Sequence, residues 1–170
     1  MIKRCALAGL CSVMASSVAM AAVDPLAPNF LVFLADDQGY GEVSAMRQAI
    51  PNLNNNITTP NIDKLMATGI RFTNFYSNAE CAVSRCSLMT GKHSGHGTIR
   101  GNKGGYLKAN DPTFLETLQT FGYKTYCQGK HHLNGNQRFR DNLPSAPWNL
   151  GCERYYGGED SGWRYPTGEP

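Results

Sequence analysis

The chain has 170 residues, of which 41% are hydrophobic and 17% charged, and its formal net charge is +3. This composition excludes an intrinsically disordered chain and suits one globular α/β domain or part of one. A nearly neutral chain without a run of basic residues also gives no support for nucleic-acid binding.

The amino terminus has the pattern of a secretory signal. Lys3 and Arg4 form a charged start, Cys5–Val18 an apolar stretch, and Ala19–Ala21 a small-x-small cleavage site. The apolar stretch is short and interrupted by serines, so we expect no membrane span after cleavage. We interpret residues 1–21 as a signal peptide and expect a periplasmic or secreted protein in an oxidising compartment.

A continuous apolar run, Phe30–Ala35, opens the part of the chain that follows the signal. It is short and lacks polar alternation, which predicts a strand buried on both faces. Asp36 and Asp37 follow directly, and two adjacent carboxylates repel each other unless a cation lies between them. Hard divalent cations take such ligands, and sites in open α/β sheets form at strand carboxyl ends. The alternative is a solvated turn, because Asp and Gly are common turn residues.

A helix and a second strand come next. After an Asn-rich segment, Ala45–Ile57, that predicts an irregular loop, Thr59-Pro60 predicts the cap and first position of a helix that ends at Gly69. Its predicted buried stripe consists of Ile62, Leu65 and Met66. The aromatic and β-branched segment Ile70–Tyr76 predicts a strand.

Cys81 and Arg85 lie four residues apart at the predicted start of a short helix that Gly91 ends. The unpaired backbone N–H groups and positive dipole end at such a start suit a tetrahedral anion, and Arg85 adds a planar donor fork. The alternative is a buried thiol, since free cysteine is among the most buried residue types. His93 and His96, in the Gly-rich run that follows, favour a loop over a metal site.

A further helix and strand end in a lysine and a histidine. Asp111-Pro112 predicts the start of a helix that precedes a strand over Tyr123–Gln128. Lys130 and His132 follow that strand, although an exposed loop is the commonest place for such a pair. Three strand ends thus supply an acidic pair, a nucleophile with an arginine, and a lysine with a histidine. The later Gly151–Glu159 block predicts aromatic packing around a Gly-rich turn.

Several of these blocks, in this order, resemble the type I sulfatases. The segment Cys81–Arg85, followed by Leu88–Gly91, resembles Cys-x-Pro-x-Arg and the Leu-x-Thr-Gly helix end of that family. Val83 stands where the family has Pro or, in some bacterial members, Ala. The aspartate pair resembles the first block of the family, which binds calcium. Residues 129–133 resemble its Gly-Lys-x-His block, with His131 where Trp is usual.

The resemblance implies an α/β fold like that of alkaline phosphatase, with a mixed, largely parallel sheet between helices. It also implies that residues 22–170 are the amino-terminal portion of a sulfatase catalytic domain. The family's later calcium ligands, leaving-group histidine and second lysine have no counterpart that could be carried over. We therefore expect a truncated part that is inactive alone.

For the site, the resemblance implies calcium-dependent hydrolysis of a sulfate ester, on an arylsulfatase-like small molecule or a glycan. A formylglycine-generating or anaerobic sulfatase-maturating enzyme would convert Cys81 to formylglycine, whose hydrate attacks sulfur. His132 would accept a proton from the hydrate, while Lys130 and Arg85 hold the sulfate and the modified side chain. The implied calcium ligands are Asp36, Asp37 and the modified Cys81.

Two alternatives remain open: a phosphoester or phosphonate hydrolase of the same superfamily, and an inactive exported remnant. The first usually has a Thr or Ser nucleophile and paired zinc, and Val83 supports the second. Conversion of Cys81 would leave three thiols after signal cleavage, Cys86, Cys127 and Cys152, which permit at most one disulfide. The sequence does not select its partners, and no cysteine spacing is that of a zinc site.

Overall fold

The computed structural model describes residues 27–47, 50, 56–135 and 143–157. The predicted signal peptide and part of the Asn-rich loop lie outside the described residues. The elements, in chain order, are the 3-10 helix η1 (Tyr40–Glu42), α1 (Ser44–Arg47), α2 (Pro60–Thr68), α3 (Cys81–Thr90), α4 (Phe114–Thr120), β1 (Tyr126–Gln128), the 3-10 helix η2 (Pro147–Leu150) and β2 (Arg154–Tyr156). Among these residues no helix is both long and apolar enough to cross a membrane.

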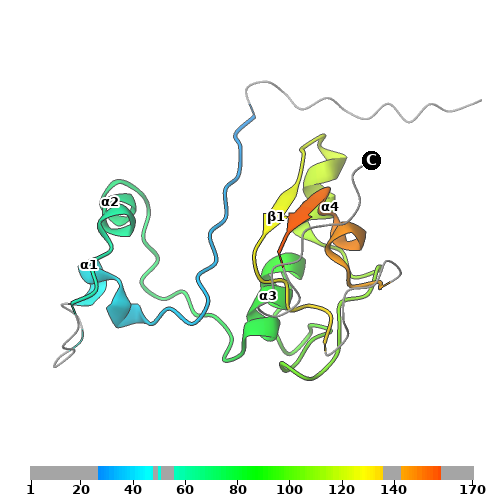
Figure 1. Cartoon of the computed structure of the whole chain (residues 1–170), viewed down its shortest axis with the longest axis horizontal. Helices are drawn as coiled ribbons and strands as arrows, with labels where there is room; N and C mark the ends of the chain where they lie inside the picture. The colour runs from blue at the N-terminus through cyan, green and yellow to red at the C-terminus, as the bar shows by residue number, and fades with distance from the viewer. Residues whose placement is uncertain (1–26, 48–49, 51–55, 136–142, 158–170) are drawn as a thin grey trace, which may run out of the picture.

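Helix α3 lies at the centre of the packing (Figure 1). One face of it joins a buried cluster whose other members come from loops and η2. That cluster contains Ala82, Val83, Cys86, Ile99, Leu107, Leu133 and Leu150. Met89, also on α3, packs against this cluster and against a second one formed by Leu115, Cys152 and Tyr155. The helix that begins with Cys81 therefore joins the two cores of the described structure.

The boundaries of α3 agree with the prediction. Gly91 adopts the left-handed conformation at φ 66°, and its N–H donates to the Ser87 carbonyl at 2.9 Å, which ends the helix. At the other end, Asn102 Oδ1 accepts the N–H of Ala82 at 3.1 Å, and the Glu80 carboxylate accepts the N–H of Asn102. These bonds fix the first turn of α3 against the loop that follows it.

A small parallel sheet is the β part of the α/β structure. β1 and β2 pair in register, with Cys127 opposite Tyr155, and they form a two-stranded sheet in the described residues. The prediction of a strand at the end of Tyr123–Gln128 is confirmed over its last three residues. The sequence did not predict β2, although the aromatic packing expected for its block is present, since Tyr155 is buried.

The two other predicted strands are wrong in this structure. Residues 30–35 and 70–76 contain no strand, and their apolar side chains are exposed, Leu31 by 79% and Ile70 by 88%. A β-strand needs a neighbour for its backbone N–H and C=O groups, and neither segment pairs with β1 or β2. High β-propensity alone did not create a strand at either position.

Helix α2 forms as predicted, with Pro60 at its first position and Gly69 at its end, but its apolar stripe is not buried. Leu65 is 66% exposed. The contact of α2 with α1 is polar instead: Ser44 Oγ donates to Asp63 Oδ2 at 2.5 Å, and the Ala45 N–H donates to Asp63 Oδ1 at 3.0 Å. Figure 1 shows α1 and α2 together, to one side of the group that contains α3, α4 and β1.

The predicted irregular loop Ala45–Ile57 begins inside a short helix, because α1 extends to Arg47.

Helix α4 begins later than predicted. Thr113 and Glu116 form a capping box, in which the side chain of each accepts a hydrogen bond from the backbone N–H of the other, so the helix starts at Phe114. Asp111 does not cap it. Its carboxylate instead accepts the Thr98 hydroxyl at 2.8 Å and the Lys108 N–H at 3.1 Å, and ties two loops together.

Candidate active site

Three chain segments bring the predicted site residues together. Asp36 and Asp37 follow the exposed segment 30–35, Cys81 and Arg85 lie in the first turns of α3, and Lys130 follows β1. The first segment reaches the other two through side-chain contacts rather than through a sheet. The structure therefore brings these residues together, although two of the predicted strands did not form.

The carboxylate of Asp36 forms ion pairs with two basic side chains, those of Lys130 and Arg85. Lys130 Nζ donates to Asp36 Oδ2 at 2.9 Å, and Arg85 Nη2 lies 3.7 Å from Asp36 Oδ1. Arg85 also donates through Nη1 to the backbone carbonyl of Lys130 at 2.8 Å. The Arg85 side chain is only 12% exposed, so this hydrogen bond and the ion pair with Asp36 offset part of the desolvation of the guanidinium. Arg85 thereby joins α3 to the loop after β1 and to the aspartate pair.

The charges of this group stabilise each other. The hydrogen bond from Lys130, followed by the nearby positive charges, lowers the pKa of Asp36 against the opposing effect of burial. The same hydrogen bond, together with the charge of Asp36, raises the pKa of Lys130. Both residues are therefore ionised near neutral pH, and Lys130 offers a positive charge beside the thiol.

Cys81 completes an arrangement with the composition of a cation site. Its Sγ lies 3.9 Å from Asp37 Oδ1, and one ligand atom from each of Asp36, Asp37 and Cys81 lies within 4.8 Å of the others. The carboxylates supply the hard oxygens that Ca²⁺ and Mg²⁺ prefer. Three ligand atoms are fewer than the usual six to eight for calcium, so the described residues would hold part of its coordination shell.

Two site residues have unusual backbone conformations. Asp37 and His132 have φ values of 58° and 51°, and they alone among the described non-glycine residues have positive φ. Such conformations cost free energy, and they cluster at ligand sites because the surrounding structure holds the side chains in place. The half-buried His132 shares the loop after β1 with Lys130. The backbone thus marks two of the residues that the sequence selected by chemistry.

A family model described as Sulfatase matches residues 28–167. The chain belongs to the sulfatase family. Arylsulfatase D of Homo sapiens is 36% identical over 141 residues, which cover 76% of this chain and 23% of the relative. Arylsulfatase G of Canis lupus familiaris is 35% identical over 135 residues, with the same coverage. Arylsulfatase A of Bos taurus is 36% identical over 126 residues, which cover 71% of this chain and 23% of the relative.

The chain thus spans less than a quarter of the length of these sulfatase relatives. Membership of the family implies its α/β fold, and the described residues contain a small parallel sheet and several helices of it. The site residues of this sulfatase chain come from each of the three blocks on which the resemblance rested.

His131 lies between two predicted site residues, Lys130 and His132, and anchors the loop after β1 through its buried side chain. Its side chain is buried, its Nε2 lies 2.8 Å from the Ser145 carbonyl, and its ring packs edge-on against Tyr155 at 6.0 Å. Burial, as the main cause, lowers its pKa to about 4. The sequence registered His131 only as a departure from the sulfatase pattern. Its position between two site residues after a strand could have indicated an inward-facing side chain.

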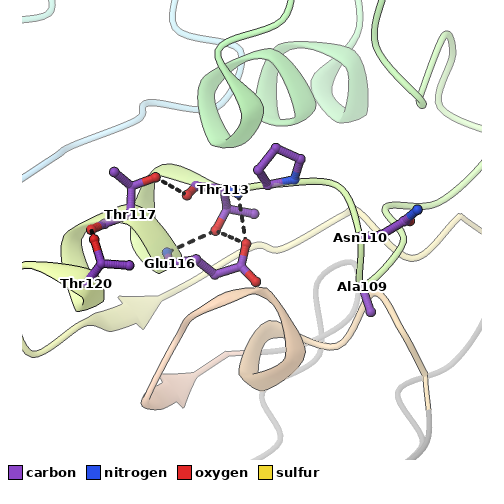
Figure 2. Close-up of a pocket in the computed structure, with 7 residues that line it drawn as sticks. Ala109, Asn110, Thr113, Glu116, Thr117 and Thr120 are labelled. Carbon is purple, nitrogen blue, oxygen red and sulfur yellow. Dashed lines mark hydrogen bonds between the residues drawn. The ribbon is translucent and has the colours of Figure 1, made fainter. Parts of the chain in front are cut away.

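A pocket of about 370 Å³ lies elsewhere, beside α4, and it carries none of the predicted site residues (Figure 2). It is lined by Ala109, Asn110, Pro112, Thr113, Glu116, Thr117 and Thr120. The one carboxylate in this lining, Glu116, already accepts the N–H and hydroxyl of Thr113 in the capping box. The capping box at the start of α4 accounts for the role of Glu116, and we assign no chemistry to this pocket.

We predict that His131 makes the stability of the chain depend on pH. Unfolded histidine binds a proton near pH 6.5, whereas the buried imidazole stays neutral down to about pH 4, so stability is lost as the pH falls through this window. At about 1.4 kcal/mol per pH unit, the loss in unfolding free energy can reach roughly 3 kcal/mol. Urea titrations at a series of pH values measure it.

In these titrations, His131→Phe should flatten the dependence between pH 6.5 and 4. The exposed His96 provides the matched control, since His96→Phe should leave the slope as in the parent chain. Aspartates with a lowered pKa, such as Asp36, contribute to the pH dependence of stability below this window. A slope that is the same in all three proteins would contradict a buried, neutral His131.

Proposed function

We propose that the protein is a calcium-dependent sulfuric ester hydrolase of the arylsulfatase type, exported to the periplasm or secreted, which acts through formylglycine made from Cys81. The observation that carries the proposal is the meeting of Cys81 with Asp37, Asp36 and Lys130 at the first turn of α3. A nucleophile there is close to a helix N-terminus and to fixed positive charges, and both favour a bound sulfate group.

The chain's own residues divide the work of the proposed reaction. Lys130 and Arg85 bind the sulfate oxygens and hold the modified side chain, since both reach the side of the site where Cys81 lies. His132 accepts a proton from the nucleophilic hydroxyl. As an aldehyde hydrate, residue 81 would supply one hydroxyl to attack sulfur and a second to release sulfate. A calcium ion held by Asp36, Asp37 and residue 81 would supply Lewis-acid stabilisation of the sulfate oxygens.

Specific observations weigh the two alternatives. A phosphoester or phosphonate hydrolase of the superfamily usually places Thr or Ser at the nucleophile and uses two zinc ions. Here the position is Cys81, and the described residues contain one possible ligand group, which includes no histidine. The alternative of an inactive remnant is favoured by Val83, because this residue departs from the family pattern Cys-x-Pro-x-Arg at the proline position. Conversion of Cys81 is therefore the decisive measurement.

We expect the given 170 residues alone to be inactive, and we predict that the full-length protein made by the host releases sulfate from an aryl sulfate and that Cys81→Ala in that protein abolishes this activity. Alanine removes the precursor of the aldehyde, so turnover should fall at least a thousand-fold. Cys86→Ala is the matched control, because Cys86 is a buried thiol of α3 that faces the core. Release of phosphate from an aryl phosphate without release of sulfate from the sulfate ester would instead support the phosphoesterase alternative.

We predict that Asp37→Ala weakens calcium binding, measured by calorimetry, at least tenfold, or about 1.4 kcal/mol. It removes one of few oxygen ligands, whereas Asp63→Ala, on α2, should leave the affinity unchanged because Asp63 instead binds Ser44 and Thr59. In the chain as given, we expect weak binding, since three ligand atoms do not fill a calcium shell. Equal affinities in all three proteins would remove calcium from the proposal.

We predict that Val83 limits the conversion of Cys81 and that Val83→Pro raises the converted fraction. Maturating enzymes read the extended cysteine segment, in which the family has proline, before folding. The folded helix should tolerate the change, because Ser84 makes the first backbone hydrogen bond of α3, to the Glu80 carbonyl at 3.0 Å. Mass spectrometry of the Cys81 peptide measures the thiol and aldehyde forms.

Both variants should be expressed in the native host and in a host that carries a known maturating enzyme. Val83→Ile is the matched control for a changed core side chain, because Val83 is 5% exposed and lies in the core and the family pattern has no isoleucine at this position. We expect the converted fraction of Cys81 to be highest in Val83→Pro. Near-complete conversion in the parent chain and in Val83→Pro alike would show that Val83 does not impede the modification.

A further inference from the structure

Cys127 and Cys152 lie together between the strands of the sheet, away from the candidate active site. Cys127 is the central residue of β1, and Cys152 precedes β2 by two positions. Both side chains contact the same apolar cluster, which includes Leu115 and Tyr155. Cys152 is 2% exposed, whereas Cys127 is half-buried.

The two thiols are direct neighbours. Their side chains hydrogen-bond to each other, and the Cys152 sulfur also lies against the backbone N–H of Cys127. The Arg154 carbonyl lies 2.9 Å from Cys152 Sγ, so the one S–H of Cys152 is within reach of two acceptors, this oxygen and the Cys127 sulfur. The two sulfurs are thus neighbours at one end of a pair of strands that is already in register, which is the arrangement that a disulfide requires.

The remaining described cysteines are not alternatives for this pairing. Cys86 is 1% exposed and belongs to the other core cluster, where its Sγ lies close to Gly97. Cys81 lies beside Asp37 at the start of α3. The four described cysteines are free thiols in the structure, and two of them form a neighbouring pair.

We propose that Cys127 and Cys152 form a disulfide bond by thiol–disulfide exchange with a disulfide oxidant such as oxidised glutathione. The proposal goes beyond sulfate hydrolysis and does not depend on it. Such a bond would fasten β1 to the segment that leads into β2. Because Lys130 and His132 follow β1 within five residues of Cys127, it would also hold one side of the candidate active site.

The chemistry proceeds in two exchange steps. The hydrogen bond from Cys152 lowers the pKa of Cys127, while the same contact and burial raise the pKa of Cys152. The Cys127 thiolate, the more accessible of the two, attacks glutathione disulfide and expels one glutathione thiolate. Cys152 then gives up its proton to solvent, attacks the Cys127 sulfur of the mixed disulfide and expels the second. Two protein thiols are oxidised by two electrons, and one glutathione disulfide is reduced.

The test is peptide mapping of the chain after equilibration in a glutathione redox buffer. Free thiols are alkylated under denaturing conditions without a reductant, and the digest is analysed by mass spectrometry. The expected result is a linked pair of peptides that contain Cys127 and Cys152, with Cys86 alkylated and Cys81 either alkylated or present as formylglycine. Alkylation of both Cys127 and Cys152, or a link that involves Cys86, would overturn the proposal.

Two variants and a control sharpen this result. In Cys152→Ser, the second step is impossible, so glutathione should remain attached to Cys127 and be detected by its mass. Cys86→Ser should retain the Cys127–Cys152 link. A thermal melt adds an independent readout: dithiothreitol should lower the apparent Tm of the parent chain and of Cys86→Ser by about 5 °C or more, and leave that of Cys127→Ser unchanged. Equal effects of dithiothreitol in all three proteins would contradict a bond at this place.

Discussion

The arrangement of the site depends on one nearly buried guanidinium. Arg85 donates to the Lys130 carbonyl at 2.8 Å and faces the Asp36 carboxylate at 3.7 Å, so one side chain of α3 holds two other segments. A charge with 12% exposure is costly unless partners replace its water, and here a carbonyl and a carboxylate do so. Lysine could not replace it, because a single ammonium lacks the planar fork that reaches both partners. Arg85 therefore links α3 to the aspartate pair and to the loop that carries Lys130, although its buried Nε has no hydrogen-bond partner among the described residues.

The sequence predicted the residues of the site better than the elements that carry them. Cys81, Arg85 and the ends of α3 follow from local signals, a glycine in the left-handed conformation and an arginine one turn from a cysteine, and these signals act within ten residues. The same locality explains α2 and its limits at Pro60 and Gly69. Where short-range chemistry determines the structure, reading the chain from the residues upward was sufficient.

Long-range pairing was not predictable in the same way. Residues 30–35 and 70–76 have the composition of strands, but a strand exists only where another backbone pairs with it, and the sequence does not state which segments meet. The converse holds for β2, whose residues Arg154–Tyr156 include two tyrosines that favour strands but form too short a segment to be recognised from sequence, and they pair because β1 lies beside them. His131 shows the same limit for side chains, since its burial follows from Tyr155 and Ser145, which are distant in sequence.

The two exposed apolar segments also affect how the chain behaves in solution. Phe33 and Phe75 are more than four-fifths exposed, and each lies in a run of aromatic and β-branched residues without proline. Such runs with unpaired backbone groups are templates for intermolecular β-pairing, so they favour aggregation. Sulfate and phosphate salts strengthen apolar association by being excluded from protein surfaces. For this chain, the product of the proposed reaction, at high concentration, therefore acts against its solubility.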